Sequence, residues 1–137
     1  MTTETILTQI DDRGVATLTM NRPELHNAFD DLLIAALTAE LRRLEADDSV
    51  RVVILAASGR SFSAGADLSW MRRMADYTRE ENLTDAQVLA ELMRTLATLK
   101  KPTIAQVQGA AFGGGWGLWP AATWPSPAGG PPSASRR

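Results

Sequence analysis

The stretch VVILAASGRSFSAGADLSW, residues 52–70, decides the fold because it joins an apolar strand to a glycine-bearing loop and then to the start of a helix. Val52–Ala57 is apolar at every position, which is typical of a central parallel strand covered by helices on both faces. In open α/β sheets, ligands bind beyond the carboxyl ends of such strands. The stretch therefore predicts an α/β fold with a candidate ligand site in loop 58–69.

The segments on either side predict the rest of the sheet and its helices. In Val15–Met20, the residues Ala16, Leu18 and Met20 alternate with Val15, Thr17 and Thr19, as the two faces of a half-buried strand do. Gly14 closes a turn before this strand. The expected elements, in chain order, are strands Thr5–Ile10 and Val15–Met20, a helix with the apolar stripe Leu33, Leu37, Leu41 and Leu44, strand Val52–Ala57, a short helix around Trp70, Met71 and Met74, a helix over Arg79–Leu99, and strand Thr103–Gln108. This order predicts right-handed crossovers onto a mostly parallel sheet.

Two of the helix starts have alternatives. Asp30 or Asp31 can cap the first helix, since both are good N-cap residues. The longest helix starts near Arg79, or later if Thr84 and Gln87 cap it instead. Its inward-facing residues are expected to be Val88, Leu92, Leu96 and Leu99.

Composition limits the functional class. The 137 residues carry a net charge of −2, which provides no basic surface for nucleic acid. There is no cysteine and a single histidine, so disulfides, cysteine nucleophiles and transition-metal sites are not expected. The first residues, MTTETILTQIDDRG, do not read as a signal peptide, and no apolar run is long enough for a membrane span. These features predict a soluble, cytoplasmic α/β domain.

A second glycine-rich loop, QGAAFGGGWG at residues 108–117, follows the last predicted strand. Glycine permits close backbone approach, so Gly65 and Gly113–Gly115 can direct N–H groups at one oxygen atom and form an oxyanion hole. A flexible turn explains three consecutive glycines equally well. A dinucleotide-binding loop is less consistent with the sequence, because no Asp or Glu follows these glycines.

Three motifs occur in order: NRPELHNAF, VVILAASGRSFSAGADLSWM and KKPTIAQVQGAAFGGG. Together they resemble the enoyl-CoA hydratase/isomerase (crotonase) family over residues 5–115. The resemblance implies a ClpP/crotonase-like spiral of β-β-α units, truncated here after the glycine-rich oxyanion loop. Within the family, GADLSWMRRM is most similar to the bacterial 3-methylglutaconyl-CoA hydratases and their relatives that act on branched acyl-CoA.

The resemblance also implies roles for individual residues. The backbone N–H groups of Ala66 and Gly114 would hold the thioester carbonyl oxygen of an unsaturated acyl-CoA. The residues that would line the coenzyme A crevice are Leu25, Ala28, Ala64, Asp67 and Leu68. Coenzyme A would enter as part of the substrate, with no separate cofactor and no metal. Family members form homotrimers or hexamers, but the resemblance implies that this chain lacks the C-terminal half that assembles them.

Some residues near the predicted site also fit purely structural roles. Asp67 is equally well explained as a loop or helix cap. His26 stands beside the expected coenzyme A loop rather than at the acyl centre, and Glu24 takes a place where some family members carry a basic residue. Trp70, Met71 and Met74 are more typical of core packing than of an acyl pocket, although Trp70 fits both roles.

The acid–base groups of the family are missing from this sequence. A hydratase uses two glutamates to orient water and deliver a proton. The first falls at Gly117 here, and no acidic residue follows Glu91. The resemblance therefore implies a family enzyme whose 137-residue chain is inactive, with a non-catalytic acyl-CoA-binding protein as the alternative.

Residues 116–137 differ in composition from residues 1–115, being rich in Trp, Pro and Ala. Back-translated and regrouped with one extra base, WGLWPAATWPSPA can read Val-Gly-Leu-Val-Ala-x-Cys-Asp-x-Ala-Ile-Ala, close to what the family would have after its glycines. This predicts a single-base frameshift near codon 116 and a disordered tail. A divergent tail is the alternative, and use of its Trp and Pro residues as a ligand segment for a protein partner is a third functional hypothesis.

Overall fold

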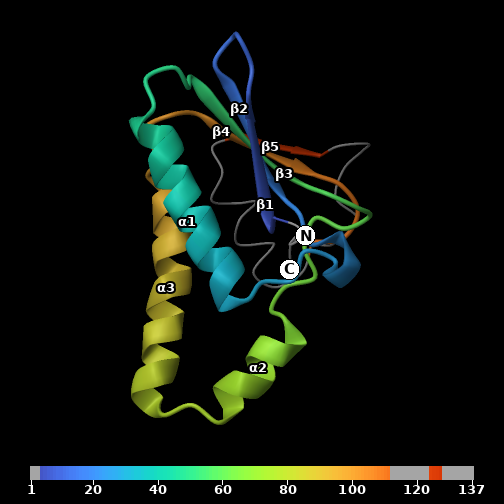
Figure 1. Cartoon of the computed structure of the whole chain (residues 1–137), viewed down its shortest axis with the longest axis vertical. Coiled ribbons are helices and arrows are strands. Elements are labelled where there is room, and N and C mark those ends of the chain that lie inside the picture. The colour runs from blue at the N-terminus through green and yellow to red at the C-terminus, as the bar shows by residue number, and fades with distance from the viewer. Residues whose placement is uncertain (1–3, 112–123, 128–137) are drawn as a thin grey trace.

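The structure, a computed structural model, describes residues 4–111 and 124–127 of the chain. Its strands form one sheet in the order β1-β2-β3-β4-β5 (Figure 1). They are β1 (Ile6–Ile10), β2 (Val15–Met20), β3 (Val52–Ala57), β4 (Thr103–Val107) and β5 (Trp124–Pro127). β1 pairs with β2 in the antiparallel sense, and every other neighbouring pair is parallel. The structure confirms the predicted mostly parallel sheet. It also confirms the four predicted strands, which are β1 to β4.

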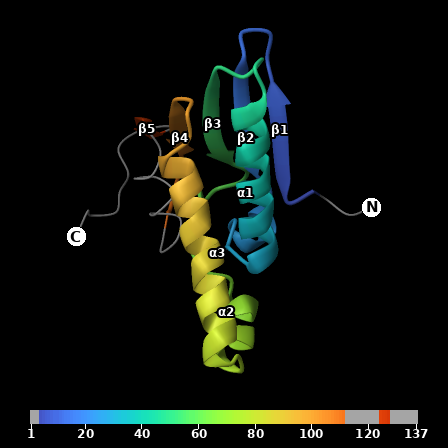
Figure 2. The same cartoon turned by 90° about the vertical axis from the view of Figure 1, so that its left-hand side faces the viewer.

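Three α-helices and a short 3-10 helix connect the strands. They are η1 (Pro23–Leu25), α1 (Asp31–Ala46), α2 (Leu68–Ala75) and α3 (Arg79–Ala97). α1 and α3 lie side by side on one face of the sheet, while α2 lies beyond its end (Figure 2). Val53 and Leu55 of β3 point into the buried face, but Val52 and Ile54 are only half-buried. The prediction that helices cover both faces of β3 is therefore wrong for the described residues.

The core lies between the sheet and the two long helices. All four residues of the predicted α1 stripe are buried: Leu33, Leu37, Leu41 and Leu44. They face the buried residues Ala16, Leu18 and Met20 of β2. Asp30 caps α1, its carboxylate accepting a hydrogen bond of 2.8 Å from the amide of Leu33. Of the two predicted caps, the structure thus uses Asp30.

α3 starts at Arg79, as first predicted, and not at the later alternative start near Thr84. Thr78 and Glu81 form a capping box, so the later start at Thr84 is wrong. Leu92 and Leu96 are buried as predicted. Val88 was expected to point inward but is 36% exposed, because it lines an open groove between α1 and α3. Leu99 follows the end of the helix and still packs against the core.

Most of the tail, including Gly117, lies outside the described residues. The described part of the tail, Trp124–Pro127, forms β5, a strand that the sequence patterns did not predict. Proline is tolerated in such an edge strand, where a missing N–H breaks no inner ladder. Among the described residues, no helix is long and apolar enough to cross a membrane. The same ranges contain no group of three His, Asp or Glu side chains that could hold a metal ion.

Candidate functional site

The loop between β3 and α2 presents the backbone amide of Ala66. Ala66 forms a parallel bridge with Phe29, in which Phe29 N–H donates to Gly65 O at 2.7 Å and Asp67 N–H donates to Phe29 O at 2.6 Å. Because the two neighbours of Ala66 make these bonds, the N–H of Ala66 itself points to the other side. Ala66 is exposed, and the described residues offer its N–H no acceptor. The loop thus holds a backbone donor to which no described residue is bonded.

Gly65 makes this conformation possible. Its φ is +89°, in the left-handed region that residues with a side chain rarely adopt. The sequence predicts that a glycine orients the backbone at this position, and the positive φ agrees with that prediction.

The segment that leads into the glycine run lies beside this loop. Ser63 and Ala111 form a second parallel bridge, with Ser63 N–H donating to Ala110 O at 3.2 Å. The close approach depends on Gly109, since a Cβ there would lie 2.0 Å from the carbonyl oxygen of Arg60. The predicted juxtaposition of the two loops is confirmed as far as Ala111. Gly113–Gly115, and so the second predicted oxyanion donor Gly114, lie outside the described residues.

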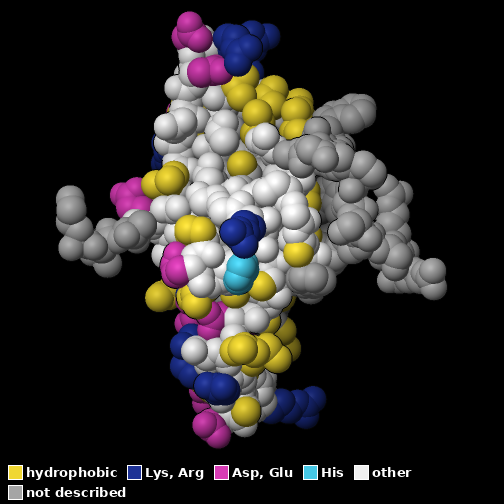
Figure 3. All heavy atoms as spheres, turned by 90° about the vertical axis from the view of Figure 1, so that its right-hand side faces the viewer, with side chains coloured by type: hydrophobic (Ala, Val, Ile, Leu, Met, Phe, Trp, Pro, Cys, Tyr) yellow, Lys and Arg dark blue, Asp and Glu magenta, His cyan; other side chains and the backbone are white. Residues whose placement is uncertain are grey.

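The residues predicted to line the coenzyme A crevice come together at the same end of the sheet. Ala64 N–H donates to His26 O at 2.9 Å, so the segment after β2 runs alongside the loop after β3. Leu25 and Leu68 are large apolar side chains that are 44% and 69% exposed, whereas Ala28 is buried. Figure 3 shows several hydrophobic side chains on the same face as the histidine, which directly borders a basic side chain. The described geometry brings these residues together, and their contact with coenzyme A stays a prediction.

Asp67 has the structural role that was the alternative to coenzyme A binding. One carboxylate oxygen accepts hydrogen bonds from the amides of Ser69 and Trp70, at 2.8 and 3.1 Å, and thereby caps α2. The other lies 3.3 Å from Nη2 of Arg22. Burial by itself raises the pKa of Asp67, but the two amides and the guanidinium outweigh it, so the pKa lies below its usual range. Asp67 is therefore an ionised helix cap.

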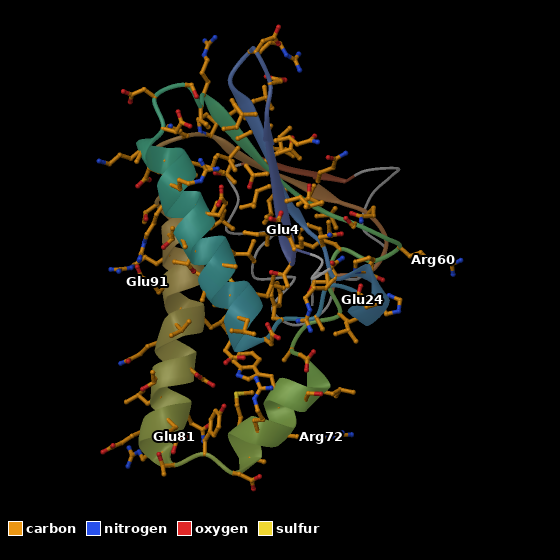
Figure 4. The ribbon with its side chains drawn as sticks, in the orientation of Figure 1. Glu4, Glu24, Arg60, Arg72, Glu81 and Glu91 are labelled. Atoms are coloured by element: carbon orange, nitrogen blue, oxygen red, sulfur yellow. The ribbon has the colours of Figure 1, made fainter. Side chains whose placement is uncertain are left out.

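Other singled-out residues lie at the periphery of this site. The Nδ1 atom of His26 lies 3.2 Å from the hydroxyl of Ser61, and both side chains are at the surface. Glu24 and Arg60 lie at the same end of the molecule, with Arg60 pointing away from it (Figure 4). Trp70 is buried and its indole N–H donates to Asp85 at 3.0 Å, so packing explains it, whereas Met71 is 48% exposed.

Sequence reasoning missed Asn27 and Arg22. Asn27 is fully buried, and its amide nitrogen donates to the carbonyl oxygens of Ser58 and Ser61 at 2.8 and 2.9 Å. Its φ of +53° is a left-handed conformation that asparagine tolerates. Both missed residues lie in the quoted motif NRPELHNAF, but no local pattern marks their partners, because the burial of Asn27 and the ion pairs of Arg22 exist only in the fold.

Comparison with known proteins identifies relatives of the chain. A model of the enoyl-CoA hydratase/isomerase family matches residues 11–123. The 1,2-epoxyphenylacetyl-CoA isomerase of Escherichia coli is 40% identical over 115 residues, covering 82% of this chain and 43% of the isomerase. The 4-chlorobenzoyl coenzyme A dehalogenase-1 of Arthrobacter is 38% identical over 106 residues, covering 77% of this chain and 38% of the dehalogenase.

A solved structure of a crotonase-type protein from Legionella pneumophila matches with 50% identity and a TM-score of 0.87, covering 90% of this chain and 47% of that one. The predicted crotonase-like fold class is thereby confirmed. The chain spans less than half the length of each of these three proteins. The match of the family model also runs to residue 123, past residue 115, where the resemblance read from the motifs ends.

Proposed function

The chain belongs to the enoyl-CoA hydratase/isomerase family, and from this premise we propose that it binds an unsaturated acyl-CoA thioester at the loop after β3. The thioester carbonyl oxygen accepts a hydrogen bond from the backbone N–H of Ala66 and a second from Gly114. In a reaction that forms an enolate at such a site, these two donors stabilise the negative charge that develops on that oxygen.

The observation that supports this proposal is the available Ala66 amide. The Phe29–Ala66 bridge fixes its direction while using none of its hydrogen-bonding capacity. A donor that is oriented before the ligand arrives needs no rearrangement at the moment of reaction. Removal of one such donor typically costs about 3 kcal/mol of transition-state stabilisation.

The surrounding surface fits the remainder of the ligand. The exposed apolar side chains of Leu25 and Leu68 offer contacts for the coenzyme A moiety, and Ala64 bonds to the segment that carries Leu25 through the carbonyl oxygen of His26. Coenzyme A is part of the substrate, and the proposal includes no further cofactor. A branched acyl chain belongs to the same proposal.

The reaction type is the finer part of the proposal. The two relatives compared above are named an isomerase and a dehalogenase, so closely similar chains perform different chemistry on coenzyme A thioesters. No acidic residue follows Glu91, and Gly117 stands at the first of the two family glutamate positions. The 137-residue chain therefore binds a thioester and polarises its carbonyl without turning it over.

Isotope-edited infrared spectroscopy of bound crotonyl-CoA tests this proposal. A ¹³C label at the thioester carbonyl isolates its stretching band, which moves to lower frequency when N–H donors polarise the bond. We expect such a shift on binding to the 137-residue chain, with no hydration product in the same sample. An unshifted band, or no binding, would contradict the oxyanion-hole proposal, while turnover would contradict the proposed inactivity.

Substitutions at Ala66 supply the matched controls. Ala66→Gly keeps the N–H and should keep the band shift. Ala66→Pro removes the N–H, but neither bond of the Phe29 bridge, because Gly65 and Asp67 make those. The variant should therefore lose a large part of the shift, and equal shifts in the two variants would exclude Ala66 as a donor.

A further inference from the structure

We propose that Arg22 is a positioning residue that fixes the backbone amide of Ala66 through the Phe29–Ala66 bridge. The chemical consequence of this inference rests on the proposed function, whereas its geometry stands on the contacts of Arg22 alone. Arg22 lies just after β2 and far from Ala66 in sequence, yet its side chain reaches the segments on both sides of the bridge.

The guanidinium joins the N-termini of two helices. Asp30 uses one carboxylate oxygen to cap α1 and places the other 3.2 Å from Nη1 of Arg22. Asp67 likewise uses one oxygen to cap α2 and places the other 3.3 Å from Nη2. The side chains of Arg22, Asp30 and Asp67 are only 13%, 16% and 11% exposed. One cation thus orients two shielded carboxylates whose second oxygens are already committed.

The same guanidinium also holds the other strand of the bridge. Its Nη1 donates to the carbonyl oxygen of Ala28 at 2.9 Å, one residue before Phe29. Phe29 in turn bonds to both neighbours of Ala66. Arg22 therefore contacts the residue before Phe29 and, at Asp67, the residue after Ala66. A side chain in this place fixes how the two backbone segments of the bridge lie against each other.

Asn27 fixes the backbone from which the Arg22 side chain extends. The N–H of Arg22 donates to Oδ1 of Asn27 at 2.8 Å, and the N–H of Asn27 donates to the carbonyl oxygen of Arg22 at 2.9 Å. Asn27 is itself bonded to the loop after β3, through Ser58 and Ser61. The backbone of Arg22 is thereby attached to the loop that carries Ala66.

Arginine is the residue type that this arrangement requires. Its planar guanidinium presents several N–H donors in a fixed geometry, so it can serve two carboxylates and a carbonyl together. Lysine carries the same charge on a single ammonium and cannot reproduce that fork. Position matters here, because the hydrogen bond that the Ala66 amide donates weakens steeply as its geometry degrades.

The first test measures the bridge in the absence of any ligand. In the 137-residue chain, NMR scalar couplings across the hydrogen bonds from Asp67 N–H to Phe29 O and from Phe29 N–H to Gly65 O report the bridge geometry of folded molecules only. Arg22→Gln should reduce both couplings to roughly half or less, because hydrogen bonds weaken steeply as their geometry degrades. Arg22→Lys should fall between, and it carries the test if Arg22→Gln does not fold.

Arg94→Gln is the matched control, since Arg94 is 71% exposed and pairs with Glu91 on α3, away from the bridge. It should leave both couplings unchanged. Unchanged couplings in Arg22→Gln and Arg22→Lys would overturn the inference whatever the chain binds.

The second test uses the carbonyl band of bound crotonyl-CoA. Arg22→Gln should lose part of the band shift that the unaltered chain shows, and Arg94→Gln should retain all of it. Reduced couplings with a full band shift would overturn the positioning role and leave Arg22 a purely structural residue. If the unaltered chain shows no band shift, the proposed function fails, while reduced couplings would still establish that Arg22 fixes the Ala66 amide.

Discussion

Two ion-pair clusters in this molecule have opposite arrangements of charge: one has a cation between two anions, and the other an anion between two cations. In the loop cluster, Arg22 lies between the carboxylates of Asp30 and Asp67. In the helix cluster, Glu91 of α3 lies between the guanidinium groups of Arg42 and Arg94. The side chains of the loop cluster are at most 16% exposed, whereas Glu91 is 31%, Arg42 57% and Arg94 71% exposed.

The two clusters differ in whether hydration can replace an ion pair that is lost. Around Glu91, solvent reaches all three groups, so breaking the pairs exchanges protein contacts for hydration at little cost. Around Arg22, each partner also bonds to backbone atoms and solvent is largely excluded, so a lost partner leaves shielded charge behind. Figure 4 places Glu91 on the helical side of the molecule, away from the end where Glu24 and Arg60 lie. The more shielded cluster is the one that adjoins the candidate site.

The largest expected effect is the loss of the shielded cation. Arg22→Leu keeps apolar bulk but leaves Asp30 and Asp67 without their shared partner, so the free energy of unfolding should fall by about 3 kcal/mol. Urea titration of the variant at neutral pH measures this change. Arg94→Leu is the control on the exposed cluster and should change the free energy far less. Equal losses in the two variants would show that exclusion of water does not distinguish the clusters.

Local patterns were sufficient to predict most of the helices and strands. The four-residue stripe of α1 and the alternation of β2 are properties of short windows, and the structure confirms both. Val88 shows the limit of the same reasoning. Helical spacing placed it on the inward face of α3, but its burial depends on whether α1 closes over that position, and α1 leaves a groove there.

The candidate site was predicted in part for a related reason. Gly65 and the loop after β3 could be recognised because glycine and strand ends are local signals. The pairing of Arg22 with Asp67 spans 45 positions, and no periodicity connects them. A helix cap at Asp67 could be predicted because capping is local, whereas its ion pair requires the fold. The sequence thus indicated where the backbone turns, but not which side chains hold the turns together.

The second expected effect is a difference in acid sensitivity at Asp67. Its pKa is lowered in the folded chain, since burial raises it less than the amides and Arg22 lower it. The stabilisation is therefore present above the unfolded value of about 3.9 and is lost as pH falls through the folded pKa. At neutral pH, Asp67→Asn should lower the free energy of unfolding by about 2 kcal/mol, since it removes hydrogen bonds to a charged group.

Urea titrations from neutral pH down into the acid range measure this difference. The gap between the unaltered chain and Asp67→Asn should narrow as the pH falls from the unfolded value through the lower folded pKa of Asp67. Below the folded pKa, both the carboxyl and the amide are uncharged. A gap that stays constant with pH would mean that the charge of Asp67 contributes nothing and that its shape alone caps α2.

The smallest expected effect is at the exposed cluster, and salt separates it from the shielded one. Hydrogen bonding from Arg94 lowers the pKa of Glu91, with Arg42 adding to it, so its ionised form is favoured in the folded chain. Exposed pairs of this kind are screened, and at about 1 M salt the Debye length is only about 3 Å. Glu91→Gln should therefore shift the urea midpoint slightly at low salt and not at all at high salt. The shift caused by Asp67→Asn should persist at high salt, because the loop cluster excludes the screening ions along with the water. A Glu91→Gln shift that survives high salt would show that exposure to screening ions does not distinguish the two clusters.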